Sequence, residues 1–349
     1  MKIASVTVVR NECDIIEEFV RYNLNFFDEM HIINHLSTDS TLNILLKLKN
    51  EGLPIKLYEY DSYRKDQHLI FTRVQDIIRK ENNTDFIMFI DSDEFISAKS
   101  KAEVEETLNK EEAVYYKIDM VEYFYKNRDL QNQNLYHQKL CYRNKYAPFV
   151  KVMINVKALG DKTIHVAQGA HSIKIEDPSY FKSIHIDKFH LAHFAVRSRE
   201  QMISKYVIGA LAYMHVERNY LEGYKYGHHI SSIYKSIINE EKIYSYDIPI
   251  ISQQEIDNNK YIFNQLPLTC ELKYSNNISV EPLENIIAYF KGYIKYNNDD
   301  HSRKDLINFL DNIDKEDKDK AILNVVKKLE VYISENINKE LEPGQLRIL

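Results

Sequence analysis

Tryptophan is absent from this chain, and glycine and proline are scarce, with 8 and 7 residues among 349. So little glycine and proline excludes collagen-like and Gly- or Pro-rich low-complexity sequences. Hydrophobic residues make up 44% of the chain, as in an ordinary globular protein. A chain of this length can bury a full α/β core, and we expect one large domain together with a smaller or extended one.

The chain has only three cysteines, Cys13, Cys141 and Cys270, which are far apart and lack the spacing of a metal finger. This excludes a dense disulfide framework and indicates free thiols in a reducing compartment. Residues 1–10 lack the apolar core of a signal peptide, and no window approaches the length of a transmembrane helix. We therefore expect a cytoplasmic protein, and peripheral attachment to the inner face of the membrane stays open.

Positive charge is not in excess. The 46 Lys and Arg residues are outnumbered by 52 Asp and Glu residues, so the formal net charge is −6. No basic run is long enough to form a local basic patch. The sequence therefore predicts no nucleic-acid partner.

Four apolar segments alternate with three amphipathic segments in the first hundred residues. We expect strands at 2–9, 30–34, 55–60 and 86–90, and helices at 14–27, 42–48 and 66–80. This alternation is typical of a mostly parallel sheet covered by helices. The predicted fold class is therefore α/β, with residues 1–100 forming a nucleotide-binding half.

Residues 101–222 are expected to complete this domain as an acceptor and metal half. After a helix near 101–110, we expect strands at 113–118, 149–159, 163–167, 170–175 and 183–194, and a helix at 198–221. Residues 123–146 show no clear period and are predicted to form a long functional loop. Residues 223–349 are polar and mainly helical, which predicts a C-terminal subdomain that covers the acceptor side or mediates self-association.

Asp91, Asp93 and Glu94 follow the apolar strand Phe86–Ile90 within four residues. Like charges this close repel, and they cannot be buried cheaply without a compensating cation. The cluster therefore indicates either a cleft that holds a metal ion or a solvated acidic turn. On this segment alone the two interpretations are equally good.

The turn after the first strand also carries polar side chains. Asn11, Glu12 and Asp14 lie between a strand and a helix, where α/β folds bind ligands. Glu12 and Asp14 equally suit the first turn of the helix, where acidic residues complement the helix dipole.

Taken in order, several motifs of this chain resemble those of the family 2 glycosyltransferases of the GT-A fold, in a bacterial branch. They are Asn11-Glu12, Ser37-Thr38-Asp39-Ser40-Thr41, Asp91-Ser92-Asp93-Glu94-Phe95, Gly169-Ala170-His171, and His193-Phe194 running into Arg197-Ser198-Arg199-Glu200-Gln201 with Lys205. Each motif is short, but five in register are much more specific than one. The resemblance covers residues 1–215. The branch's Trp-x-x-Phe-Gly element is missing, and only Met120–Phe124 stands in its place.

The resemblance implies an enzyme that transfers a sugar from a nucleoside diphosphate sugar, expected to be a UDP-sugar, with inversion. The implied acceptor is a glycan or lipid-linked glycan of a lipopolysaccharide, capsule or glycoprotein. Residues of the motifs are then expected to bind the donor: Asn11, Glu12, Asp39, Asp91, Ser92, Arg197 and Lys205. Arg73 is expected to approach the diphosphate or to pair with Asp76 or Glu94.

A divalent cation, Mn²⁺ or Mg²⁺, lowers the barrier to such a transfer by bridging diphosphate oxygens. We expect Asp93 as the principal ligand, Asp91 on the metal, the ribose or both, and a histidine as the third ligand. By resemblance that histidine is His193 or His171, with His193 favoured. The other three histidines of residues 165–193 are expected to be structural: His165, His185 and His190.

An inverting transfer needs a carboxylate base for the acceptor hydroxyl. Glu122, expected after the fifth strand, and Glu94, beside the metal motif, are the candidates, although most such carboxylates are simply solvated. A nucleotidyl transferase is the alternative enzyme, but the loop Arg10-Asn11-Glu12 lacks the glycines that class usually has. A non-catalytic binding protein on the same fold is the other alternative.

Overall fold

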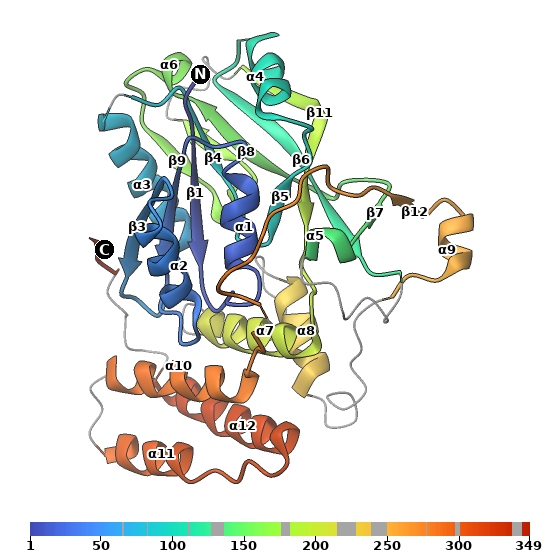
Figure 1. The fold of residues 1–349 in the computed structure, drawn as a ribbon. Coiled ribbons are helices and arrows are strands. Elements are labelled where there is room, and N and C mark those ends of the chain that lie inside the picture. The colour runs from blue at the N-terminus through green and yellow to red at the C-terminus, as the bar shows by residue number, and fades with distance from the viewer. Residues whose placement is uncertain are drawn as a thin grey trace.

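The computed structural model describes residues 1–64, 66–81, 83–110, 112–126, 136–175, 182–214, 228–238, 250–276, 278–296, 301–336 and 344–349. In these residues a mixed sheet of 11 strands forms the centre of the molecule, and a group of helices lies at one end of it (Figure 1). None of the described helices is long and apolar enough to cross a membrane.

The first hundred residues fold as predicted into parallel strands joined by helices. The strands lie in the order β3-β2-β1-β4 and all run parallel. They are β1 (Ile3–Val9), β2 (Glu29–Asn34), β3 (Ile55–Tyr60) and β4 (Phe86–Phe89), and the helices are α1 (Ile16–Asn23), α2 (Thr41–Asn50) and α3 (Gln67–Glu81). Every residue of β4 is buried, as the apolar run 86–90 predicts for a central strand.

The two faces of this sheet are covered by different helices. Apolar residues of α1 and α2 pack with Ile3 and Val9 of β1, whereas those of α3 pack with Ala4 and Val6. Successive side chains of a strand point to opposite faces, so β1 contributes to both cores. The α/β class and the helical C-terminal region are therefore confirmed.

The second half of the sheet is mixed rather than parallel. An antiparallel strand, β8, lies between β4 and β6, and β11 runs parallel to β6 while pairing antiparallel with β5. The elements of this half are β5 (Glu94–Ile96), α4 (Lys101–Lys110), β6 (Tyr115–Phe124), α5 (Tyr136–Lys139), β7 (Tyr142–Asn144), β8 (Phe149–Asn155), α6 (Val156–Leu159), β9 (Ile164–Val166), β10 (Ile173–Ile175) and β11 (Ser183–His193). The pair β9–β10 forms a small sheet of its own.

The predicted loop at 123–146 is wrong in part. Strand β6 continues to Phe124, and β7 pairs with its end, so Tyr123 and Phe124 lie opposite Arg143 and Tyr142. The aromatic residues of this segment suit a pleated, half-buried surface, which a search for apolar periodicity misses. The middle of the segment, 127–135, lies outside the described residues.

The C-terminal region is mainly helical, as predicted, but it also returns twice to the sheet. Its elements are α8 (His228–Ile238), α9 (Gln253–Asp257), β12 (Tyr261–Phe263), α10 (Pro282–Tyr296), α11 (His301–Asp311), α12 (Lys318–Asn336) and β13 (Leu346–Ile348), preceded by α7 (Arg199–Met214). Strand β12 extends the sheet beside β7, and β13 closes the opposite edge beside β3. The predicted boundary at 222 falls among residues 215–227, outside the described part.

Candidate active site

The sheet has a topological switch point between β1 and β4. The chain runs outward from β1 through β2 to β3, and then returns to place β4 on the other side of β1. In open α/β sheets, ligands bind at the carboxyl ends of the strands where the order reverses in this way. Here those ends are the turn Arg10–Asp14 after β1 and the segment Ile90–Glu94 after β4. Both polar clusters that the sequence singles out therefore lie at the same crevice.

Asp93 is the centre of the side-chain cluster at this crevice. Its buried carboxylate pairs with Lys205 Nζ, lies 3.5 Å from His193 Nε2 and lies 3.8 Å from Arg197 Nη1. Burial acts to raise the pKa of Asp93, but these cations hold it well below its usual range. The structure thus brings together Asp93 and three of the residues predicted for the metal or the diphosphate.

Arg197 and Lys205 reach the cluster from different elements. Lys205 lies on α7, which begins at Arg199. Arg197 lies in the preceding turn, fully buried, and its guanidinium pairs with Glu12 Oε2 and lies 2.7 Å from Asp14 Oδ2. Glu12 and Asp14 are therefore not first-turn helix acids, since α1 begins at Ile16.

Asp91 belongs to a second group around a buried lysine. Lys151 on β8 pairs with Asp91 Oδ2 and lies 3.2 Å from Glu94 Oε1. Gln67 donates a hydrogen bond of 2.8 Å to Asp91 Oδ1, and the backbone N–H of Asp91 donates one of 2.9 Å to Glu94 Oε2. Both acids of this group are thereby fixed beside Asp93.

One member of this cluster, Lys151, escapes the sequence analysis. It stands in the predicted strand 149–159, where its charge in an apolar run is the available signal: a buried lysine needs carboxylate partners. The sequence singles out Asp14, but not its pairing with Arg197, because the two are 183 residues apart.

The cluster carries more acidic than basic groups. Five carboxylates face three permanent cations, which leaves a formal charge of −2 when all five are ionised and His193 is neutral: Asp91, Asp93, Glu94, Glu12 and Asp14 against Lys151, Lys205 and Arg197. Burial raises the pKa of Glu12 and of Glu94 to about 7, although Arg197 and Lys151 act to lower them. A bound cation would relieve this imbalance.

The turn after β1 is held against the start of α2. Asn11 adopts a left-handed φ of 55° and exchanges hydrogen bonds with Thr38, donating to its hydroxyl and accepting from its backbone N–H. Asp39 accepts from the backbone N–H groups of Thr41 and Cys13. Asn11, Glu12 and Asp39 therefore lie together, and Asp39 ties α2 to this turn.

Arg73 is not part of the cluster. Its exposed side chain donates a hydrogen bond of 2.9 Å to the carbonyl of Gly344 and so holds the C-terminal segment. The predicted partners Asp76 and Glu94 are not the ones it contacts. Ser92 is buried in the turn between Asp91 and Asp93. In the described part of the chain, His171 makes no hydrogen bond or ion pair with the acids of the cluster. Its Nδ1 donates to the carbonyl of Val150 at 2.8 Å, and burial lowers its pKa.

Glu122 lies beside His193 in the sheet. It is a residue of β6 itself, not of the segment after it, and it pairs in register with His193, which in turn pairs with Glu94. Paired residues of neighbouring strands point to the same face. In the described part of the chain, Glu122 is partly exposed and has no hydrogen bond or ion pair.

The residues at Asp93 fit a divalent cation in their chemistry. Asp91 and Asp93 offer carboxylate oxygens and His193 an imidazole, a donor set that suits Mn²⁺. His193 Nδ1 is buried without a hydrogen-bond partner, and the local charge is −2 as counted above. Among the described residues, however, no three His, Cys, Asp or Glu side chains already converge as a ligand set, because Lys205 and Lys151 neutralise the two aspartates.

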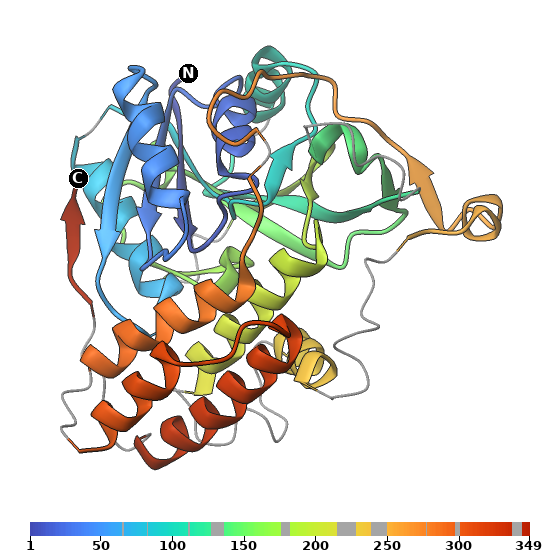
Figure 2. The ribbon, with the colours of Figure 1, turned by 60° about the horizontal axis from the view of Figure 1, so that its bottom comes forward.

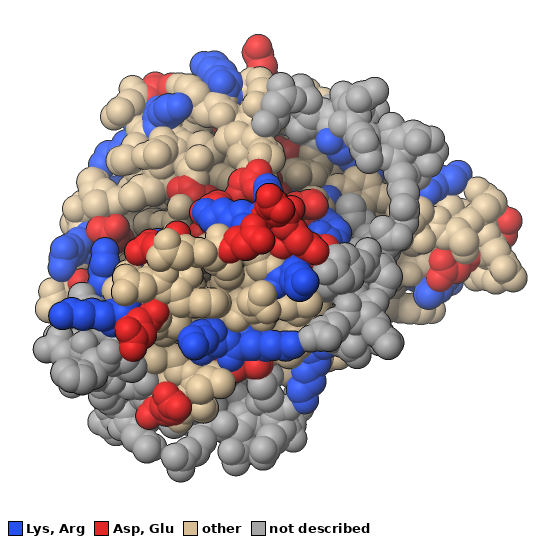
Figure 3. All heavy atoms as spheres, turned by 90° about the horizontal axis from the view of Figure 1, so that it is seen from below, with Lys and Arg blue, Asp and Glu red and all other residues tan. Residues whose placement is uncertain are grey.

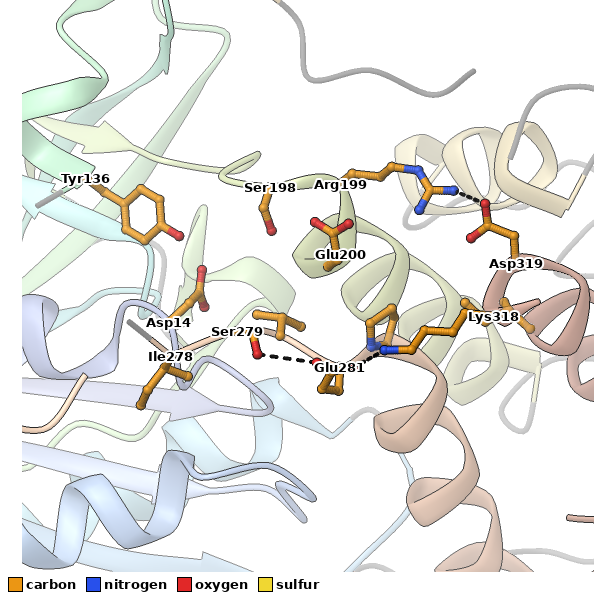
Figure 4. A pocket seen from close by; sticks show the side chains of 13 residues that line it. Asp14, Tyr136, Ser198, Arg199, Glu200, Ile278, Ser279, Glu281, Lys318 and Asp319 are labelled. Atoms are coloured by element: carbon orange, nitrogen blue, oxygen red, sulfur yellow. Dashed lines mark hydrogen bonds and ion pairs between the residues drawn. The ribbon is translucent and has the colours of Figure 1, made fainter. Parts of the chain in front are cut away.

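A cavity of about 410 Å³ opens next to Asp14, between the starts of α7, α10 and α12. Figure 4 shows Tyr136 and Asp14 at one side of it and the pairs Arg199–Asp319 and Lys318–Glu281 at the other. On the face seen in Figure 3, acidic side chains gather with basic ones beside them. The cavity itself is lined by four acidic and two basic side chains: Asp14, Glu200, Glu281 and Asp319 with Arg199 and Lys318.

A second cavity, of about 470 Å³, lies at the other end of the strands, beside Met1, Asp85 and Phe86. It is remote from the switch point, so it is not the candidate site.

No protein-family model matches the chain, and no curated protein matches its sequence. Among solved structures, it is similar to S. aureus TarS 1–349 in complex with UDP, at 13% identity and a TM-score of 0.35, over 100% of this chain and 96% of that one. It is also similar to the mannosyltransferase PcManGT of Pyrobaculum calidifontis in complex with GDP-Man and Mn²⁺, at 12% identity and a TM-score of 0.36, over 97% and 88%. At TM-scores below 0.5 these likenesses decide nothing about this chain, whose function has to be inferred from its own site.

Proposed function

We propose that the protein is a glycosyltransferase of the GT-A type, which moves a sugar from a nucleoside diphosphate sugar to an acceptor hydroxyl. The observation that carries this proposal is the buried cluster around Asp93 at the switch point of the sheet. It supports the proposal because Lys205, Arg197 and the carboxylates Asp91 and Asp93 lie together at the end of the sheet where we propose that the diphosphate binds. Cations fixed at such a position stabilise the transition state.

Asp91, Asp93 and His193 are the residues that would hold a divalent cation, Mn²⁺ or Mg²⁺. When bound, the cation would neutralise charge on the departing diphosphate. In the structure, Lys205 pairs with Asp93 and Lys151 pairs with Asp91. Lys205 is the first of the cations that lower the pKa of the buried Asp93. Arg197 holds Glu12 and Asp14 in place, and thereby fixes the turn that faces the donor.

Glu122 is the better of the two candidate bases. Glu94 is fully buried and already accepts the backbone N–H of Asp91, so it has no access to an incoming hydroxyl. Glu122 is partly exposed and unpaired among the described residues, on the same sheet face as His193. A carboxylate placed there accepts the proton of the acceptor hydroxyl as the sugar is transferred with inversion.

The finer parts of the proposal rest on the motif resemblance. They are a UDP-sugar donor, a glycan or lipid-linked glycan acceptor, and action in the cytoplasm at the inner face of the membrane. Self-association through the C-terminal region belongs to them as well. Binding of each nucleotide sugar, vesicle flotation and sedimentation test these parts separately.

The decisive experiment incubates the protein with a panel of UDP- and GDP-sugars and Mn²⁺, and measures donor binding and slow donor hydrolysis. We expect Asp93→Asn to reduce metal-dependent hydrolysis about 100-fold or more. The matched control is Asp187→Asn, an exposed position on the same strand as His193. If no nucleotide sugar binds, or if Asp93→Asn hydrolyses the donor as fast as the control, the proposal fails.

A further inference from the structure

Four aromatic side chains lie side by side on one face of the sheet extension formed by β6, β7 and β12. Phe124, Tyr142 and Phe263 pair in register across the three strands, and Tyr261 lies two residues before Phe263. Ring centroids are 5.1 Å apart for Phe124 and Tyr261 and 5.4 Å apart for Tyr142 and Phe263. We call these four residues the aromatic ladder.

The aromatic ladder is open to solvent. Phe263 is 59% exposed, which is unusual for a phenylalanine in a strand, and the other three rings are partly exposed. Lys126 and Lys260 lie over the rings of Tyr142 and Tyr261, at 5.6 and 5.2 Å from the centroids. The surface is therefore apolar and edged by positive charge, at the end of the molecule away from α10–α12 (Figures 1 and 2). Its rings meet edge to face, with interplanar angles of 65° and 72° in the two pairs.

The ladder continues the sheet face that carries the proposed base. Glu122 and Phe124 are two residues apart on β6, so both side chains point to the same side of the strand, about 7 Å apart along it. The alternate residues Tyr123 and Tyr125 point the other way and are buried. From Phe124 the ladder reaches Phe263 in two strand spacings, about 10 Å. The rings lie across the strands and Glu122 lies along β6, so a chain molecule on the ladder brings its end to Glu122 if it turns along β6 at Phe124.

Saccharides suit such a surface, because the C–H face of a sugar ring packs flat on an aromatic ring while its hydroxyl groups stay in water. We propose that the aromatic ladder binds the saccharide chain of the acceptor and presents its terminal hydroxyl to Glu122. This inference rests on the proposed function and adds where the acceptor lies. A membrane surface is the other partner that aromatic and lysine side chains attract, but it would not require the ladder to share a sheet face with Glu122.

The absence of tryptophan from the chain makes a direct test simple. Phe263→Trp places a single indole in the ladder of the full-length protein, and Ile348→Trp places one at an exposed position on β13, at the opposite edge of the sheet. Tryptophan emission is followed during titration with chitopentaose, maltopentaose and a hyaluronan hexasaccharide, and with phosphatidylglycerol vesicles. UDP-sugar binding to the same variants is measured by calorimetry.

We expect at least one oligosaccharide to shift the emission of Phe263→Trp saturably, and none to shift that of Ile348→Trp. In calorimetry, Phe263→Ala should lower the affinity for the same oligosaccharide about tenfold and leave the affinity for the UDP-sugar unchanged. An emission shift with vesicles alone, or no shift with any oligosaccharide, overturns the inference even if the nucleotide sugar binds. If the oligosaccharide signal is present but the wild-type protein binds no nucleotide sugar, the proposed function is overturned instead.

Discussion

Lys151 shows how a single residue sets the electrostatics of the candidate site. It is 1% exposed, stands in the apolar strand β8 and is the cation nearest to both Asp91 and Glu94. Burial alone would lower its pKa, yet the two carboxylates raise it, so Lys151 stays charged. Removing the lysine would leave two buried carboxylates without their partner.

We therefore predict that Lys151→Met lowers the free energy of unfolding by about 3 kcal/mol, because a buried charge pair that loses one partner is strongly destabilised. Lys157→Met, at an exposed position on α6, should change it by less than about 0.5 kcal/mol. Urea denaturation at neutral pH measures both. Equal effects of the two substitutions would show that Lys151 does not neutralise the cluster.

Glu122 allows a prediction that separates the two halves of the reaction. If it accepts the proton of the acceptor hydroxyl, Glu122→Gln should lower the rate of sugar transfer about 100-fold or more. Hydrolysis of the donor by water and affinity for the donor should change far less, since Asp93 and Lys205 are untouched. Steady-state rates with and without acceptor test this, and a proportional loss in both would assign Glu122 a structural role.

At the residue scale, the sequence predicts the members of the cluster better than their roles. Asp91 and Asp93 are recognisable because they follow a buried strand at the edge where ligands bind, whereas His193 is named by the motif resemblance alone. Which cation faces which acid depends on contacts over more than a hundred residues, such as that of Arg197 with Asp14. Periodicity and spacing carry no information about such contacts.

Helix α1 organises its surroundings through two adjacent buried glutamates. Glu17 accepts hydrogen bonds from the backbone N–H groups of Lys273, Tyr274 and Ser275, and so anchors the segment that leads to α10. Glu18 accepts from the backbone N–H groups at the start of α5, at 2.9 and 2.8 Å. The sequence predicts α1 from its apolar period, but it does not show that its acidic face is an anchor.

The anchor at Glu17 predicts a dependence of stability on pH. Burial acts to raise the pKa of Glu17, but the three backbone N–H groups and Arg21 lower it below the ordinary value of 4.5. A carboxyl group with a lowered pKa in the folded state contributes stability above its unfolded pKa, and loses it as the pH falls through the folded pKa. The contribution of Glu17 should therefore disappear as the pH falls below about 4.5.

Glu17→Gln should consequently be less stable than the wild-type protein at pH 7, by about 1–3 kcal/mol. The difference should shrink as the pH falls through the acid range. Glu51→Gln, which removes the surface ion pairs with Arg21 and Lys273, should change stability much less than Glu17→Gln. Thermal unfolding of the three proteins from pH 7 to pH 3 provides the comparison, and a constant difference between wild type and Glu17→Gln would contradict the anchor.

In the whole molecule, the helical C-terminal region and the candidate site share one support, α7. This helix carries Lys205, and 11 of its 16 residues are buried, packed with apolar residues of α8, α10 and α12. Asn285 on α10 donates a hydrogen bond of 3.1 Å to Ser204 Oγ, and its carbonyl accepts one from Thr38 beside Asn11. A division of the chain after residue 222 is natural in the sequence, but it cuts through this common core.

We therefore predict that a chain ending at residue 222 does not bind a nucleotide sugar. Removing α8, α10 and α12 exposes most of the apolar surface of α7, and each large side chain that becomes exposed costs about 1.5–3 kcal/mol. The summed cost of several exposed side chains exceeds the free energy of unfolding of a typical domain, which is about 5–15 kcal/mol. Without an ordered α7, Lys205 leaves Asp93, and the buried acids of the cluster lose a cation.

Hydrogen exchange of residues 199–214 and calorimetry with the nucleotide sugar that the full chain binds measure the two effects together. A chain ending at residue 343 lacks only residues 344–349, which include β13. It keeps α7 packed and should retain donor binding. If the chain ending at 222 protects α7 and binds the donor as the full chain does, the helical region is a separate module. The position of Lys205 must then be maintained by the sheet alone.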